Sequence, residues 1–106
     1  MEDCVFCKVV KGETETKLEK ETQNLIVFRD IQPQAPVHLL IVPRKHVKDV
    51  GELDDKVWKE IKDVAVAIAR ERSMLGYRLV HNAGDSAAVA HMHVHLLGEV
   101  PSDRAV

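Results

Sequence analysis

The chain has 106 residues and a mass of 11.9 kDa, which is enough for one domain but leaves no room for a second hydrophobic core. A net charge of −2 and an isoelectric point near 6.3 exclude a strongly basic nucleic-acid-binding surface as the main functional feature. The longest apolar run, residues 64–69, is too short to span a bilayer. We therefore expect a single domain over residues 1–106, with no nucleic-acid partner and no membrane association. The acidic N-terminus, which lacks an apolar signal segment, favours a cytoplasmic location.

The first half of the chain contains three segments with the composition of β-strands. A short edge strand is expected over residues 18–20, and a strand of four apolar residues over 25–28. The segment 32–36 holds two prolines, which restrict their own backbone and that of the preceding residue, so it is expected to be a loop. An apolar strand follows over 37–42 and stops at Pro43.

The second half begins with an amphipathic helix. Apolar residues recur at helical spacing, and the helix is expected to run from about Asp55 to Ser73, with Asp54 as its N-cap and Gly76 as a left-handed C-terminal cap. Two further strands are expected over 77–80 and 91–97.

This order of elements predicts an α+β domain. The connections between consecutive strands are too short for parallel crossovers, except for the one that carries the helix. We therefore expect an antiparallel sheet with one long helix packed on one face.

Three histidines alternate along the last predicted strand. Because side chains of a strand point alternately to its two faces, His91, His93 and His95 are expected on one face, pointing outward, about 7 Å apart. The apolar residues between them are expected to face the helix. Two chemistries use such a row: histidines can bind a catalytic zinc, or one imidazole can attack a substrate while its neighbour handles the leaving group's proton.

The seven residues from His91 to Leu97 read HMHVHLL, which matches every position of the motif of the histidine triad (HIT) family. Segments 28–31, 33–38, 43–46 and 79–82 also resemble the family's segments and follow in its order. The resemblance covers about residues 4–98 and is greatest to the Hint-type, nucleoside phosphoramidase-like branch.

The resemblance implies a role for individual residues. His93 resembles the nucleophile that attacks the α-phosphorus and forms a covalent nucleotidyl-histidine intermediate. His95 resembles the histidine beside the phosphate and leaving group, and His38 the fourth histidine that faces the triad. The residues expected to bind the substrate are Asp30 at the ribose hydroxyls, Ile31 at the base, Asn82 near the ribose and phosphate, and Val89.

The two cysteines of the chain have the spacing of a zinc knuckle, Cys4-x-x-Cys7. Two thiolates need two more ligands, and His46 and His91 are the candidates. Members of the family that carry such a pair complete the site at these two positions. The resemblance therefore implies one structural zinc per chain and no catalytic metal; the alternative is a pair of reduced, buried cysteines beside a solvated His46.

The resemblance implies a hydrolase or transferase acting on the α-phosphate of purine nucleoside phosphoramidates or related nucleotidyl substrates. It also implies a homodimer paired through the long helix, where Trp58 lies off the main apolar stripe, and a strand. Two alternatives stay open: a zinc-dependent hydrolase whose triad binds the metal, and a nucleotide-binding or interaction module with little turnover. The latter is favoured by Ala87 and Ala88, which stand where the family commonly has side-chain hydrogen-bond donors.

Overall fold

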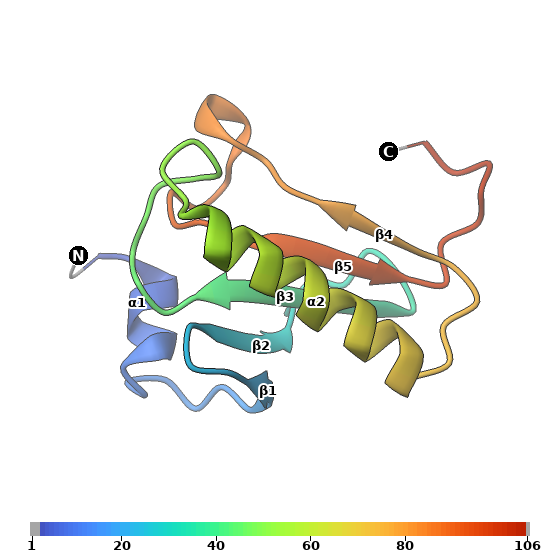
Figure 1. Cartoon of the computed structure of the whole chain (residues 1–106), viewed down its shortest axis with the longest axis horizontal. Helices are drawn as coiled ribbons and strands as arrows, with labels where there is room; N and C mark the ends of the chain where they lie inside the picture. Colours follow the sequence, from blue (N-terminus) through green and yellow to red (C-terminus); the bar gives the residue numbers. More distant parts are fainter. Residues whose placement is uncertain (1–2, 106) are drawn as a thin grey trace.

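Five antiparallel strands form the sheet on which the rest of the chain is built (Figure 1). The computed structural model describes residues 3–105. Along the sheet the strands are ordered β1-β2-β3-β5-β4. Their bounds are β1 Leu18–Glu21, β2 Leu25–Arg29, β3 Val37–Pro43, β4 Tyr77–Val80 and β5 Val94–Gly98. The predicted α+β fold with an antiparallel sheet is confirmed.

The last strand in the chain is inserted between β3 and β4. In its register, Leu40 of β3 and Val80 of β4 both pair with His95 of β5. Strands β3 and β4 therefore run in the same direction, and the long connection between them is supplied by helix α2, Asp55–Glu71. Within residues 3–105, no helix combines the length and the apolar character needed to cross a membrane.

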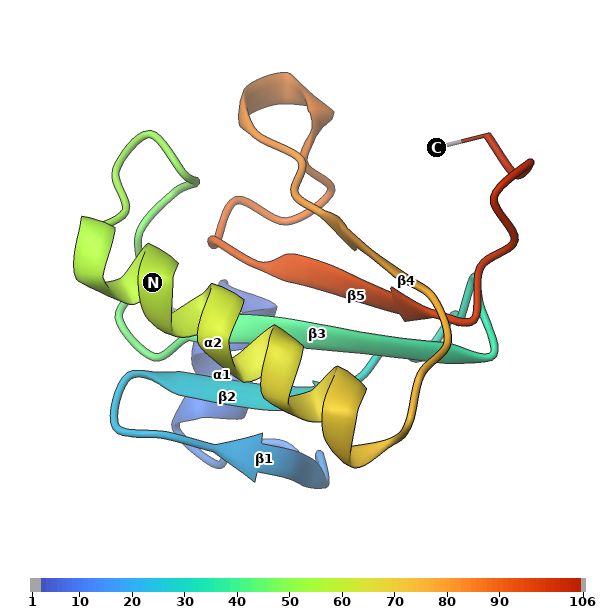
Figure 2. The same ribbon diagram turned by 45° about the vertical axis from the view of Figure 1, so that its right-hand side comes forward.

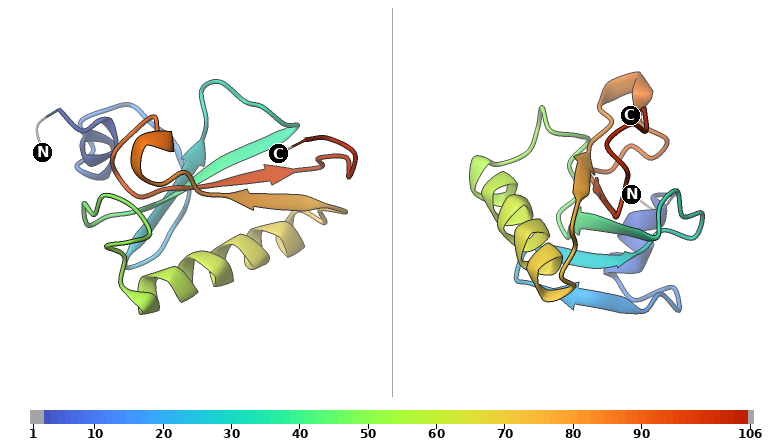
Figure 3. Two further views of the ribbon diagram at one scale, coloured as in Figure 1. Left: turned by 90° about the horizontal axis from the view of Figure 1, so that it is seen from above. Right: turned by 90° about the vertical axis from the view of Figure 1, so that its right-hand side faces the viewer.

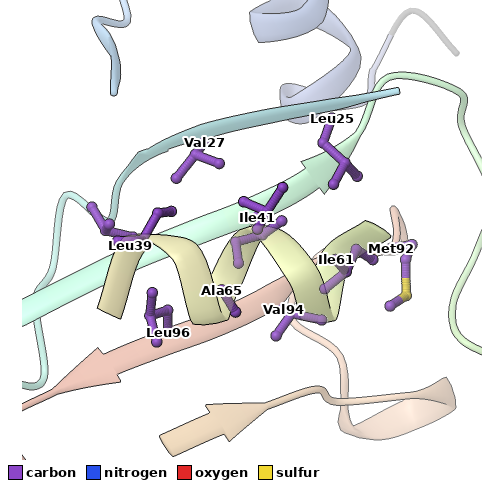
Figure 4. Packing of buried hydrophobic residues seen from close by; sticks show 11 residues of the cluster. Leu25, Val27, Leu39, Ile41, Ile61, Ala65, Met92, Val94 and Leu96 are labelled. Carbon is purple, nitrogen blue, oxygen red and sulfur yellow. The ribbon is translucent and has the colours of Figure 1, made fainter. Parts of the chain in front are cut away.

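Helices cover both faces of the sheet. Helix α2 packs on one face, and the short helix α1, Val5–Val10, lies against the other, as the two views of Figure 3 show. The main core lies between the sheet and α2, and its most deeply buried side chains interdigitate in Figure 4. Its members are Leu25, Val27, Leu39, Ile41, Ile61, Val64, Ala65, Ile68, Met92, Val94 and Leu96. A second cluster under α1 consists of Phe6, Val9, Ile26, Phe28, Leu40 and Val42.

The two ends of α2 differ in how well the sequence predicted them. Asp54 is the N-cap as expected, because its carboxylate accepts a hydrogen bond from the N–H of Lys56 at 2.7 Å. The predicted C-terminal cap at Gly76 is wrong: the helix ends at Glu71, and Ser73 adopts the left-handed conformation, with φ of 52°. The N–H groups of Ser73 and Met74 bond to the carbonyls of Arg70 and Ala69, which is the Schellman pattern, and Met74 then packs against the main core.

Two further differences concern the face that carries the histidines. Strand β5 begins at Val94 and not at His91, so residues 91–93 of the predicted strand lie outside the ladder, with His91 in a bend. Helix α1 was not predicted; it is a single short helix whose N-cap is Cys4, with the Sγ accepting the N–H of Cys7 at 3.4 Å. Helix α1 covers a sheet face that the alternation of residues predicted to be exposed to solvent.

Gly98, the last residue of β5, provides a test of the packing at this end of the sheet. A Cβ at this position would lie 2.8 Å from the Cβ of Val37 and 3.0 Å from the Sδ of Met74. We expect Gly98→Ala to lower the free energy of unfolding by about 1–3 kcal/mol, because the packed neighbours have to shift. Urea denaturation measures the change.

The matched control is Gly76→Ala, where a Cβ would come no closer than 3.9 Å to another heavy atom, the carbonyl oxygen of Val100. This variant should stay within about 0.5 kcal/mol of the parent. Equal unfolding free energies for the two variants would contradict the close packing described around Gly98.

Candidate functional site

The triad histidines are buried on the sheet face opposite α2. His91 is 0% and His93 4% exposed, while His95 is half-buried. Helix α1, which lies behind the middle strands in Figure 2, covers them through Phe6, whose ring meets the rings of His91 and His93 edge-on, with centroids 5.9 and 4.9 Å apart. The expectation that this face points outward is therefore corrected: the histidines line the interior of two adjacent polar sites.

The first site brings together the four predicted metal ligands. The Sγ of Cys4 lies 3.3 Å from Nδ1 of His91, and the Sγ of Cys7 lies 3.2 Å from Nδ1 of His46 and 3.5 Å from Nδ1 of His91. All four ligand atoms lie within 4.8 Å of one another. A tetrahedral zinc with the usual bond lengths would separate sulfur and nitrogen ligands by about 3.6 Å, so only small shifts are needed to reach zinc geometry.

The hydrogen bonds around His91 suit a metal ligand. Its Nε2 lies 2.8 Å from the carbonyl oxygen of Pro43, which can only accept, so Nε2 carries the proton. The unprotonated Nδ1 then points at the two sulfurs, and the carbonyl acts as the outer partner that orients a ligating imidazole. Burial raises the pKa of the Cys7 thiol, and the hydrogen bond with Cys4 raises it further, so a cation is needed to hold two thiolates here. The residues present fit zinc.

The second site begins at His93, two residues further on. Its Nδ1 lies 2.7 Å from the carbonyl oxygen of His91, and by the same reasoning Nδ1 carries the proton. Nε2 is then the nitrogen with a free lone pair. Burial lowers the pKa of His93 below its ordinary value, and the bond to the His91 carbonyl opposes this only in part, so the ring is neutral at pH 7.

A pair of hydrogen-bonded histidines stands beside His93. The main-chain N–H of Gln34 donates to Nδ1 of His38 at 3.0 Å, so the proton of neutral His38 is on Nε2, which donates to Nδ1 of His95 at 2.8 Å. The remaining proton of His95 is therefore on its Nε2. Burial, followed by the charges of His93 and His38, lowers the pKa of His95 to about 4. The ring centroids of His93 and His95 are 5.1 Å apart.

A carboxylate completes the second site. One oxygen of Asp30 lies 3.4 Å from Nε2 of His38 and 4.0 Å from Nδ1 of His95, and the other accepts the N–H of Gln32 at 2.8 Å. Burial lowers the pKa of His38, while the charge of Asp30 opposes that shift. The structure thus places three predicted catalytic residues and the predicted ribose ligand together.

The spacing of Asp30, His38 and His95 would also suit a metal, because their ligand atoms lie within 4.8 Å of one another. The hydrogen bonds do not. A ligating nitrogen needs a free lone pair, yet Nδ1 of His38 accepts the Gln34 N–H, which leaves the proton on the Nε2 that would have to bind the ion. In His38 the protonated nitrogen faces the possible metal position, whereas in His91 the unprotonated nitrogen does. The donor set formed by Asp30, His38 and His95 therefore does not fit a metal.

The other predicted substrate residues surround these sites at different depths. Ile31 is 94% exposed in the loop after β2. Asn82 is half-buried just beyond β4. Val89 is half-buried, packs against the cluster under α1, and shares a pocket with Cys4 and His46. The structure thus places Val89 on the side of the first site.

Two contributors were missed by sequence reasoning. The main-chain N–H of Gln34 sets the protonation of His38, but no side chain signals that role. The ring of Phe6 covers His93. In the sequence, the one indication of this role was the position of Phe6 between the two cysteines.

Known proteins share this fold and these sequence features. A family model described as scavenger mRNA decapping enzyme C-terminal binding matches residues 3–104. An uncharacterized HIT-like protein from Methanocaldococcus jannaschii is 34% identical over 108 residues, covering 97% of this chain and 84% of that protein. A 14 kDa zinc-binding protein from Zea mays is 38% identical over 104 residues, covering 89% of this chain and 80% of that protein.

A solved structure gives the same result in three dimensions. The HIT family hydrolase from Clostridium thermocellum superposes with a TM-score of 0.90 at 36% sequence identity, covering 100% of this chain and 98% of that one. Fold, sequence and the geometry around the three histidines agree, and the chain belongs to the histidine triad family of hydrolase-like, nucleotide-binding proteins.

Proposed function

We propose that this protein is a hydrolase or transferase that acts on the α-phosphate of purine nucleoside phosphoramidates, or of related nucleotidyl substrates, through a covalent intermediate on His93. The observation that carries the proposal is the protonation of His93. Its Nδ1–H is committed to the His91 carbonyl, so the ring presents an unprotonated Nε2 beside the His38–His95 pair. The likeness to a HIT family hydrolase supports this reaction class.

In the proposed first step, Nε2 of His93 attacks the α-phosphorus. A nitrogen–phosphorus bond forms to the ring, and the bond from phosphorus to the leaving amine breaks. The ring becomes positively charged, and the Nδ1–H bond to the His91 carbonyl stabilises that charge. Water then attacks the phosphorus, the nitrogen–phosphorus bond to His93 breaks, and the proton of the water passes to Nε2 of His95, which releases the nucleoside monophosphate and neutral His93.

The leaving amine needs a proton, which we assign to His95. In the free protein its Nε2–H is available as a donor, while its low pKa keeps the ring neutral. A bound phosphoryl anion would favour the charged form of His95 and raise its pKa; the added proton would go on Nδ1, in place of the hydrogen bond from His38, and the Nε2 proton would pass to the leaving amine. In the free protein, His38 holds the ring through Nδ1.

The nucleoside end is assigned to residues around the loop after β2. Asp30, fixed by the Gln32 N–H, would accept hydrogen bonds from ribose hydroxyls, and the exposed Ile31 would be covered by the base. Asn82 remains a proposed contact near the ribose and phosphate, and Val89 a proposed substrate contact. AMP and GMP are the expected products.

One observation favours a second candidate, a nucleotide-binding module with little turnover. The loop before His91 offers no donor side chain at Ala87 or Ala88, and the N–H of Ala87 already bonds to the carbonyl of Gly84 at 3.1 Å. Fixed donors aimed at developing charge contribute much of the catalysis at phosphorus. With fewer of them, nucleotide binding would be retained while turnover is slow.

We further propose that Cys4, Cys7, His46 and His91 hold one structural zinc per chain. The donor set and its spacing support this, as does the zinc-binding relative. Four protein ligands would leave no position for a catalytic water. The ion would join α1 to the loop after β3 and to the segment that carries the triad. Its role would be to hold α1, which covers the second site through Phe6, in place.

A homodimer is also part of the proposal. Trp58 on α2 and both Tyr77 and Leu79 on β4 are large apolar side chains that remain exposed. Trp58 and Leu79 line one pocket together with Ile61 and Val94. A second copy of the chain docked on α2 and the edge strand β4 would cover these residues.

Replacing the nucleophile tests the covalent mechanism. We expect His93→Ala to lower kcat for AMP release from a fluorogenic adenosine phosphoramidate by about 10³-fold or more, because no other group forms the intermediate. AMP affinity by calorimetry should change little. A nucleotidyl adduct trapped on the parent protein should map to His93. A variant that keeps over half of the parent rate would refute the mechanism, and a parent that binds AMP without turnover would favour the binding module.

The pH dependence of kcat/KM tests the state of His93 in the free enzyme. The attacking ring must be neutral, and burial lowers its pKa below the ordinary value of 6.5. Activity on a nucleotidyl aryl ester, whose acidic phenol leaves as the anion and needs no proton from His95, should therefore stay level from pH 8 down to pH 6.5. It should fall only at lower pH, where His93 becomes protonated. Half-maximal activity at pH 6.5 or above would contradict the buried, neutral nucleophile.

Removing one zinc ligand separates the structural from the catalytic role of the metal. We expect metal analysis to find one zinc per chain, and Cys4→Ser to lose it together with stability on the order of several kcal/mol. The specific activity of the protein that stays folded should fall less. Val5→Ala, an exposed change in the same helix, is the control and should keep both zinc and stability. Parent protein purified without chelator that contains no zinc would overturn the assignment.

A further inference from the structure

His81, the one histidine to which the proposed function gives no role, lies directly behind the nucleophile. It follows β4, whose ladder with β5 ends at the pair Val80 and His95. Its side chain lies on the α2 side of the sheet, in a pocket that it shares with Trp58, Ile61 and Val94. The triad rings occupy the opposite face. His81 therefore approaches His93 through the main chain and not through the substrate site.

Two hydrogen bonds fix the ring of His81. Its Nε2 lies 3.1 Å from the main-chain nitrogen of Val50, which donates its proton, so Nε2 carries none. The ring proton is then on Nδ1, which donates to the carbonyl oxygen of His93 at 2.9 Å. Each ring nitrogen thus has the one partner that suits it, and the imidazole links the loop before α2 to the residue that bears the nucleophile.

The link matters because His93 lies just outside the sheet. Strand β5 begins at Val94, so ladder pairing does not hold the residues before it. The segment 91–93 is held instead by bonds to single groups: the His91 ring to the Pro43 carbonyl, the Met92 N–H to the Val47 carbonyl at 2.8 Å, and the His93 carbonyl to His81. The first two bonds hold the residues that precede His93 in the chain, whereas the bond from His81 holds His93 itself.

The partner loop is itself fixed. Val47 and Val50 lie in the same connection between β3 and α2, and Asp49 between them accepts the N–H of Gly51 at 2.9 Å and the N–H of Gly84 at 3.1 Å. The loops before α2 and after β4 are therefore joined at two points, by His81 and by Asp49. These loops are green and orange in Figure 1, and the ring of His81 connects both of them to the His93 carbonyl.

We propose that His81 is a positioning residue for the nucleophile: its Nδ1–H fixes the main-chain carbonyl of His93 and thereby the angle from which the His93 ring meets the phosphorus. This inference rests on the proposed function of His93. The ring has one hydrogen bond of its own, to the His91 carbonyl, which sets its rotation but not the position of its backbone. Displacement of a reacting group by about 1 Å can cost on the order of 100-fold in rate.

Two amide substitutions separate the bonds that His81 makes. In His81→Asn the side-chain NH₂ group takes the place of Nδ1 and can donate to the His93 carbonyl, but the acceptor for Val50 is lost. In His81→Gln the side-chain oxygen takes the place of Nε2 and can accept from Val50, but the donor to His93 is lost. His81→Leu loses both. Each amide variant gives up one bond of the same kind, so the two should differ little in thermal stability.

The test measures kcat and KM for an adenosine phosphoramidate on the zinc-loaded protein and its three variants. We expect His81→Gln and His81→Leu to lower kcat by about 10–100-fold while KM stays within about twofold of the parent value. His81→Asn should retain most of the parent kcat. Gln and Leu variants within twofold of the parent kcat, or an Asn variant as slow as the Leu variant, would overturn the proposal. So would losses that follow thermal stability, because those would mark a structural role.

A second readout does not depend on turnover. The His93 carbonyl and the Val94 N–H belong to one peptide unit, so the amide resonances of Val94 in a ¹H–¹⁵N NMR spectrum report on the bond from His81. We expect them to shift in the Gln and Leu variants and to stay near the parent position in Asn. If the parent proves inactive, the proposed function fails while this spectrum still decides the link. Val94 resonances that are the same in all four proteins would overturn it.

Discussion

The structure of both sites depends on how His91 uses three of its atoms. Its Nε2–H is held by the Pro43 carbonyl, its Nδ1 faces the two cysteine sulfurs, and its own carbonyl holds the Nδ1–H of His93. One residue therefore orients both a proposed metal ligand and the proposed nucleophile. The ring is fully buried, and displacement of His91 would disturb both sites together. The two sites are coupled by covalent connection and by hydrogen bonds to the main chain.

The same principle explains how chemically identical side chains take different roles. A neutral imidazole has one donor and one acceptor nitrogen, and the partner of one decides the role of the other. Carbonyl partners leave His91 and His93 with a free lone pair, at Nδ1 in the first and Nε2 in the second. An N–H partner does the opposite at His38, which becomes a donor toward His95. The proposed roles in metal binding, attack on phosphorus and proton delivery are thus distinguished by the main chain around each ring, not by residue type.

Features that depend on side-chain patterns could be predicted from the sequence, whereas features that depend on tertiary or main-chain contacts could not. Strands β2 and β3 and helix α2 followed from periodicity, because such patterns reflect which side chains are buried together. The grouping of Cys4 and Cys7 with His46 and His91 followed from the resemblance to the family. The start of β5 and the cap at Ser73 did not follow, since both depend on tertiary contacts, at Val94 with β3 and at Met74 with the core. Nor could alternation show that α1 covers the histidine face, because a six-residue helix carries too little periodicity to be recognised. The ring protonation states are out of reach of any motif, since a main-chain partner such as the Gln34 N–H has no side-chain signature.

The charge of the second site adds a constraint on how it can work. At neutral pH the described groups nearest the nucleophile are neutral rings and one carboxylate, Asp30, because burial lowers the pKa of His38, His93 and His95. A phosphoryl anion entering such a site meets a negative charge and few fixed positive ones. Ala87 and Ala88 offer no side-chain donors, so in the proposed mechanism the anion would depend more heavily on the His95 N–H. Binding of the anion and protonation of His95 would then favour each other, and the proton needed by the leaving group would be taken up as the substrate binds. A buried, neutral histidine pair is suited to this sequence of events, because it gains its charge only when a negative partner is present to stabilise it.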